Sequence, residues 1–187
     1  MQTAPPHKLF GREQIETLNK AVSMAEELVS NHFKMSASQW LHPKYDVKTM
    51  ADLAPEEIVH GPFAQIIRYE GKRKGSELGS GSYDFYKICL QDHAILCVLD
   101  NHKHLALLPF CLYVVTHELV HIVRFSKFLQ SFKATSEEKI KEERRVHALT
   151  HKILKSIPTP GLDQVIQYFH EWHRPLEDLD NRKLDQV

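Results

Sequence analysis

Residues 109–128 read PFCLYVVTHELVHIVRFSKF and are apolar on almost every side of a helical projection. A helix with one polar face lies on a surface, whereas a helix that is apolar all round must be covered on every side. Pro109 suits the first turn of a helix, where its missing N–H is not needed. This segment therefore predicts a helix in the centre of the domain, around which the rest of the chain must pack.

Three further segments predict helices that could cover the central one. Each places apolar side chains three or four residues apart with charged side chains between them, which is the pattern of an amphipathic helix. The acids after Ser136 fit a capped first turn, and the prolines after Ile157 end the same helix. The three segments are residues 11–33, 136–157 and 162–173.

A β-hairpin is predicted between the first helix and the central one. Residues 62–70 and 83–90 are rich in β-branched and aromatic side chains, and the glycine- and serine-rich residues 71–82 connect them. The apolar run at residues 94–100 predicts a third strand, whose free edge could bind a substrate as an added strand. Residues 35–60 predict a loop with one short helix. Together these elements predict an α+β fold with a small twisted sheet.

The length of 187 residues is that of one domain. We expect a single domain over residues 1–173, followed by a charged C-terminal tail over residues 174–187. Hydrophobic residues make up 42% of the chain and charged residues 26%, which excludes wholesale disorder. Basic and acidic residues number 24 each, so no excess charge would recruit nucleic acid or an anionic membrane.

The cysteines and the N-terminus favour a cytoplasmic protein. Cys89, Cys97 and Cys111 are predicted to be reduced and to pack as small buried hydrophobes. The N-terminus has prolines where a secretory signal needs an apolar stretch. The longest apolar run, at residues 105–115, is shorter than the ~18 residues that a membrane span needs. The oligomeric state stays open.

The central segment contains the sequence His117-Glu118-Leu119-Val120-His121. Four residues of α-helix bring the two imidazoles onto one face about one turn apart, where both can bind one ion. Glu118 can then reach a metal-bound water and act as the general base of a hydrolysis. The alternative is a pair of core histidines beside a salt-bridged Glu118. Buried polar groups without partners cost several kcal/mol, however, and a metal supplies the partners.

A third ligand is expected on the following helix, which returns beside the central one. Residues 142–147 read EERRVH, and we take Glu143 as the third ligand. His147, four residues on and on the same face, could support the site by a hydrogen bond or replace Glu143 as ligand. Glu142 lies comparably close to the apolar stripe and is a further alternative. Each glutamate taken alone is typical of a solvated charge run.

A second group of polar residues lies near the C-terminus, where the sequence reads YFHEWH. Its His170 and His173 are rivals for the third ligand position, and Tyr168 or either histidine could donate a hydrogen bond to an oxyanion. Two neutral imidazoles, one carboxylate and a position left for water suit a catalytic zinc ion, and iron(II) accepts the same set. We expect zinc.

The sequence VVTHELVHIV at residues 114–123 resembles the extended signature of the zincin metallopeptidases, in which uncharged residues surround HExxH. The later ERRVH at residues 143–147 is similar to the gluzincin branch, where a helix-borne glutamate is the third zinc ligand. The pattern looks most like the small ImmA/IrrE-type peptidases, although His147 stands where they have asparagine or aspartate. The resemblance implies the zinc ligands His117, His121 and Glu143 and the catalytic base Glu118.

The sequence therefore predicts a zinc-dependent metallopeptidase that hydrolyses protein or peptide substrates through a zinc-bound water activated by Glu118. Two other classes remain open. A zincin-like regulatory or binding protein would have the same motif with a structural metal and no turnover. A non-peptidase amide hydrolase would share the water chemistry and differ in its substrate pocket.

Overall fold

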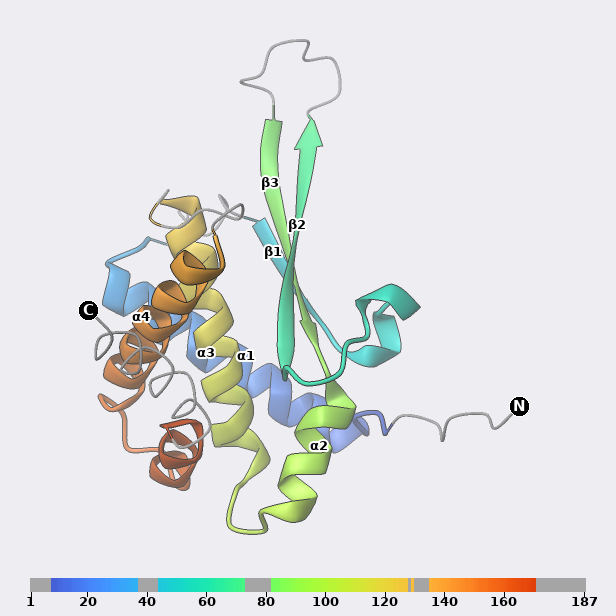
Figure 1. The fold of residues 1–187 in the computed structure, drawn as a ribbon. Helices are drawn as coiled ribbons and strands as arrows, with labels where there is room; N and C mark the ends of the chain where they lie inside the picture. Colours follow the sequence, from blue (N-terminus) through green and yellow to red (C-terminus); the bar gives the residue numbers. More distant parts are fainter. Residues whose placement is uncertain (1–7, 37–43, 73–81, 128, 130–134, 171–187) are drawn as a thin grey trace, which may run out of the picture.

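The computed structural model describes residues 8–36, 44–72, 82–127, 129 and 135–170, and its fold combines helices with a small sheet (Figure 1). The predicted α+β class is confirmed. Residues 162–170 form a helical segment after the last labelled element. In chain order the labelled elements are α1 (Arg12–Phe33), β1 (Lys44–Lys48), η2 (Met50–Asp52), η3 (Pro55–Glu57), β2 (Ala64–Lys72), β3 (Ser82–Leu90), α2 (Asp92–Asn101), α3 (Leu107–Ser126) and α4 (Ser136–Leu154).

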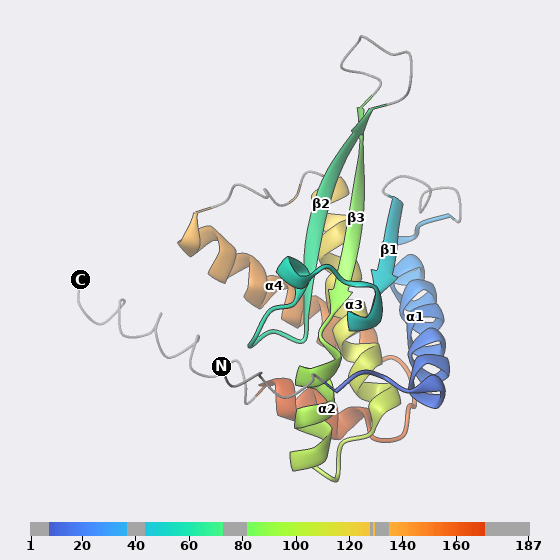
Figure 2. The same ribbon diagram turned by 90° about the vertical axis from the view of Figure 1, so that its right-hand side faces the viewer.

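The sheet of the described residues has the strand order β1-β3-β2. The predicted hairpin is confirmed, because β2 runs antiparallel to β3, with Ile66 opposite Ile88, and β1 pairs with β3 in parallel. Alternate side chains of β3 point to one face, and Tyr86, Ile88 and Leu90 on that face are buried. These residues belong to the same core as the helices, so α1 and α3 cover this face of the sheet (Figure 2).

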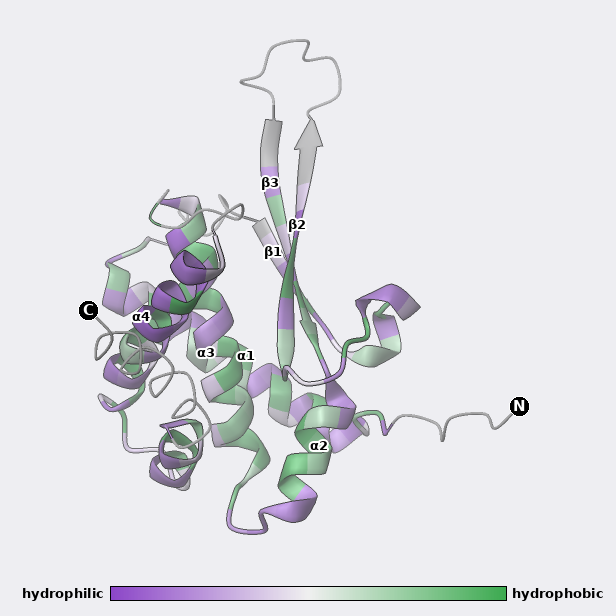
Figure 3. Cartoon of the chain, in the orientation of Figure 1, coloured by the Kyte–Doolittle hydropathy of each residue, from purple (hydrophilic) through white to green (hydrophobic). Residues whose placement is uncertain are grey.

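Helix α3 forms the centre of the core, as its apolar sequence predicts. Nearly every residue from Pro109 to Arg124 is buried, and both α1 and α4 pack against the helix. Figure 3 shows α3 as hydrophobic along much of its length, whereas α4 is largely hydrophilic. The apolar run at residues 105–115 continues into this 20-residue helix, which is long and apolar enough to cross a membrane; 83% of its most apolar stretch is buried inside the protein.

The third strand predicted at residues 94–100 is wrong, because these residues belong to helix α2. A short run that is apolar at consecutive positions has no period that separates a strand from a buried helix. Asp92 accepts backbone N–H bonds from Phe10 and Met50 through its carboxylate, which fixes the start of α2. The strand that completes the sheet is β1, within a segment predicted as a loop.

The predictions for the cysteines and for the start of α4 are confirmed only in part. Cys89 and Cys111 are buried as predicted, but Cys97 is exposed; all three are free thiols. Thr135, rather than Ser136, caps α4 by accepting the backbone N–H of Glu138. The predicted tail at residues 174–187 lies outside the described residues.

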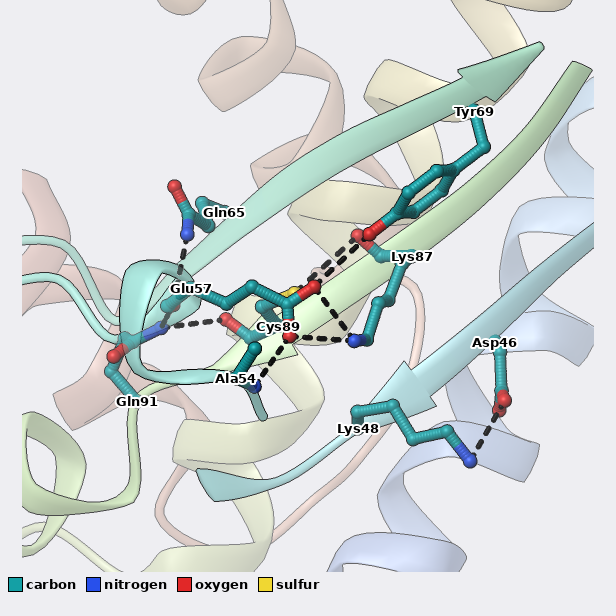
Figure 4. A network of polar contacts seen from close by, with 9 residues as sticks. All are labelled: Asp46, Lys48, Ala54, Glu57, Gln65, Tyr69, Lys87, Cys89 and Gln91. Carbon is teal, nitrogen blue, oxygen red and sulfur yellow. Dashed lines mark hydrogen bonds and ion pairs between the residues drawn. The ribbon is translucent and has the colours of Figure 1, made fainter. Parts of the chain in front are cut away.

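The segment between β1 and β2 is tied to the sheet through Glu57, which is 6% exposed (Figure 4). Its carboxylate accepts bonds from Lys87 Nζ at 2.6 and 2.8 Å, from the Tyr69 hydroxyl at 3.0 Å and from the Ala54 N–H at 2.8 Å. Its backbone carbonyl accepts a bond from Gln91 Nε2 at 3.0 Å. This anchor precedes residues 62–64, which lead into β2 and form one wall of the site described next.

Candidate metal centre

Helix α3 carries His117 and His121 on one face, one turn apart, as the spacing predicts. Both side chains are buried, with 7% and 8% of the residue surface exposed. Their Nε2 atoms lie 3.1 Å apart. The two imidazoles are therefore directed at a common point, as two ligands of one ion would be.

Helix α4 brings Glu143 to the same point. Its Oε1 lies 3.0 Å from Nε2 of His117, and its Oε2 lies 3.2 Å from Nε2 of His121. A tetrahedral zinc ion with bonds of 2.0–2.1 Å holds its ligand atoms about 3.3 Å apart. The three side chains that the sequence predicted as ligands are thus spaced as the ligands of one small cation.

The register of α4 against α3 is set by the residue before Glu143. Glu142 is 7% exposed and forms a buried ion pair with Arg124 of α3, through both its Oε1 and its Oε2, and Arg145 adds a contact at 3.2 Å. Successive residues on a helix are about 100° apart, so Glu143 faces the histidines when Glu142 faces Arg124. Glu142 is therefore neither a solvated charge nor a member of the cluster.

The cluster fits a zinc ion. If each imidazole carried a proton on Nε2 to donate to Glu143, the two N–H groups would face each other at 3.1 Å, and a cation at that point removes the conflict. The Nδ1 of His117 is buried without a hydrogen-bond partner in the described part of the chain, so this side chain interacts on its Nε2 side. Burial opposes ionisation of Glu143, but the two imidazoles that face its carboxylate outweigh burial and hold its pKa below the ordinary value. An anionic carboxylate and two imidazoles are a typical zinc donor set.

A cavity of about 90 Å³ lies beside these side chains, and Glu118 lines it. Burial raises the pKa of Glu118, with partial compensation from His117 and His121. Much of the remaining wall is apolar and comes from Pro62, Phe63, Ala64, Val114 and Phe169. A larger cavity of about 700 Å³, between α1 and β1, includes none of the predicted site residues.

His147 lies next to the cluster. One ligand atom each from His117, Glu143 and His147 lies within 4.8 Å of the others, so His147 offers a second way to complete a set of three. Its Nε2 is 3.8 Å from Oε1 of Glu143. The Nε2 of His121 is closer to Glu143, at 3.2 Å from its Oε2, and lies 3.1 Å from Nε2 of His117. The shorter distance to the carboxylate of Glu143 favours His121 as the ligand and His147 as its neighbour.

Tyr113 and His151 also belong to this region, although the motif does not point to them. The Tyr113 hydroxyl lies 2.7 Å from Nδ1 of His147 and 2.9 Å from Nε2 of His151. Tyr113 precedes His117 by four residues, and His151 follows His147 by four. This helical spacing is the signal in the sequence that could have indicated both residues.

The rivals predicted near the C-terminus are not part of the described cluster. His170 is exposed at the end of the segment 162–170, and His173 lies outside the described residues. Tyr168 is half-buried, and its ring packs 5.9 Å from that of Phe110 and 5.4 Å from that of Phe169.

Comparisons of the chain with protein-family models, with curated proteins and with solved structures give no match. The resemblance to the zincins stays an expectation from the motif.

Proposed function

We propose that the protein is a zinc-dependent metallopeptidase. The observation that carries this proposal is the convergence of His117, His121 and Glu143, whose donor atoms lie 3.0–3.2 Å apart beside a cavity lined by Glu118. Two helices from separate parts of the chain contribute to this cluster. A zinc ion bound there would polarise the carbonyl of a scissile amide and acidify a water molecule.

Glu118 is the proposed general base. Glu118 lines the cavity, and burial raises the pKa of its carboxyl group toward neutral pH, where a base both accepts and returns a proton efficiently. In this proposal Glu118 takes a proton from the attacking water and delivers it to the leaving amine. The apolar walls of the cavity restrict water, which strengthens electrostatic interactions with the reacting groups.

The substitution Glu118→Gln tests this role. The amide is nearly isosteric but cannot accept the proton, so we expect hydrolysis to fall by on the order of 10²–10⁴-fold while zinc content stays at the wild-type level. The measurement is cleavage of a diverse peptide library by the zinc-loaded protein, followed by mass spectrometry. Glu137→Gln, an exposed change on α4, is the matched control and should retain full activity. Undiminished cleavage by Glu118→Gln would refute the assignment of the base.

A further inference from the structure

A chain of three polar side chains runs from the cluster into the core between α3 and α4. His147 and His151 lie one turn apart on α4, and the Tyr113 hydroxyl bridges them from α3, at 2.7 Å from Nδ1 of His147 and 2.9 Å from Nε2 of His151. At its other end, Nε2 of His147 lies 3.8 Å from Oε1 of Glu143, which is an ion-pair distance and longer than a hydrogen bond. The chain therefore connects a buried phenol to the carboxylate of the candidate site.

Tyr113 is held rigidly. The residue is 1% exposed, and its ring is stacked on that of Phe169, with centroids 3.9 Å apart and planes within 5° of parallel. Tyr113 also lines the cavity beside the cluster, but with so little of the residue exposed, bulk water can do little to replace a lost hydrogen bond. A hydroxyl fixed in this way can fix the imidazole to which it is bonded.

The two hydrogen bonds that join Tyr113 to His147 and His151 have a direction. The Tyr113 hydroxyl has one proton, so it donates to one imidazole and accepts from the other. The carboxylate of Glu143 favours an N–H on the Nε2 of His147 that faces it. Nδ1 of His147 then accepts from Tyr113, and the Nε2–H of His151 donates to the Tyr113 oxygen. In this arrangement His147 presents an N–H to Glu143 and is not itself a metal ligand.

We propose that Tyr113 and His151 are positioning residues of the metal centre, which act through His147 to hold the carboxylate of Glu143 in place. This proposal rests on the proposed function, because it requires a metal bound by His117, His121 and Glu143. Groups that orient metal ligands typically change affinity about 10–100-fold when they are removed. Tyr113 would belong to this class although it does not contact the ligand carboxylate.

The test is a double-substitution cycle on zinc affinity, measured by competition with a chromophoric chelator. We expect Tyr113→Phe to weaken zinc binding about 10-fold and His147→Ala by about 10–100-fold. The double variant should bind no more weakly than His147→Ala alone, because Tyr113 acts through His147. Tyr168→Phe removes a half-buried hydroxyl that makes no hydrogen bond to the described residues and should leave affinity unchanged.

His151 supplies a second pair of variants, which is informative even if Tyr113→Phe folds poorly. His151→Gln keeps an N–H that can reach the Tyr113 oxygen and should retain wild-type affinity, whereas His151→Leu removes the donor and should weaken binding several-fold. The absorption spectrum of the cobalt-substituted protein should change in His151→Leu and not in His151→Gln. A global loss of stability would not separate these two variants in this way.

The outcomes distinguish the two proposals. If the wild-type protein binds no zinc that depends on His117 and His121, the proposed function fails and the positioning role fails with it. If the wild-type protein binds zinc but Tyr113→Phe and His151→Leu do so with unchanged affinity, only the positioning role is overturned. An additive loss in the double variant of Tyr113 and His147 would also overturn it.

Discussion

Glu142 and Glu143 are adjacent on α4 and have opposite surroundings. The side chain of Glu142 is 8% exposed and paired with Arg124, whereas that of Glu143 is 38% exposed and directed at two imidazoles. The sequence EERR does not distinguish them, because both fit a solvated charge run and Arg124 is distant in the chain. Only the packing of α3 on α4 assigns one glutamate to an ion pair and the other to the candidate site.

This difference predicts separate effects for two neighbouring substitutions. Glu142→Ala leaves Arg124 buried without its partner, so we expect the free energy of unfolding of the metal-free protein to fall by about 3–5 kcal/mol, with little change in the zinc affinity of folded molecules. Glu143→Ala should weaken zinc binding by more than about 100-fold and affect the metal-free fold less. Urea denaturation and chelator competition measure the two quantities. The opposite pattern would show that Glu142 is the ligand.

At the scale of elements, helices are predicted well where their apolar pattern continues over several turns. The apolar positions of α1 repeat at helical spacing over several turns, and α3 is apolar on nearly every side over a similar length, so both helices are recognisable in the sequence alone. The prediction for residues 94–100 is wrong because seven residues are too few to show whether apolar positions repeat as in a helix or as in a strand. The prediction for β1 is wrong because Lys44–Lys48 becomes a strand only by pairing with β3, about 40 residues later. Elements that depend on distant partners are not encoded locally.

The anchor of the η2–η3 segment makes a prediction about acid stability. Lys87 and the Ala54 N–H hold the pKa of Glu57 below its ordinary value. Such a carboxylate stabilises the fold above its unfolded pKa of about 4.3, and this contribution is lost as the pH falls through the lower folded pKa. We therefore expect Glu57→Gln to be less stable than the wild type at neutral pH and to lose less stability below about pH 4.3.

The pH dependence of the urea midpoint measures this effect. Glu56→Gln, at the exposed neighbouring position, is the control and should follow the wild type. A wild-type pH dependence in Glu57→Gln would mean that the ion pair with Lys87 does not contribute to acid lability.

At the scale of the whole molecule, the candidate site draws on four parts of the chain: α3, α4, residues 62–64 that lead into β2, and the segment 162–170. The motif residues on α3 could be predicted because their spacing is local, and Glu143 could be proposed because one ligand was missing. The contributions of Phe63 and Phe169 to the cavity could not, since they depend on how the hairpin and the last helical segment pack around α3. Tyr113 lies four residues before His117, which places both on one face of α3. A tyrosine in an apolar helix is nevertheless expected to be an ordinary core residue, so the spacing alone does not single it out.

The central claim is that His117, His121 and Glu143 hold one metal ion. Its most direct test is the zinc content of the purified protein after dialysis against zinc and then against zinc-free buffer, measured by plasma mass spectrometry. We predict about one zinc per chain for the wild type and for His102→Ala/His104→Ala, a pair whose rings lie 5.8 Å apart outside the cluster, and almost none for His117→Ala/His121→Ala. Stoichiometric zinc in His117→Ala/His121→Ala, or none in the wild type, would contradict the claim.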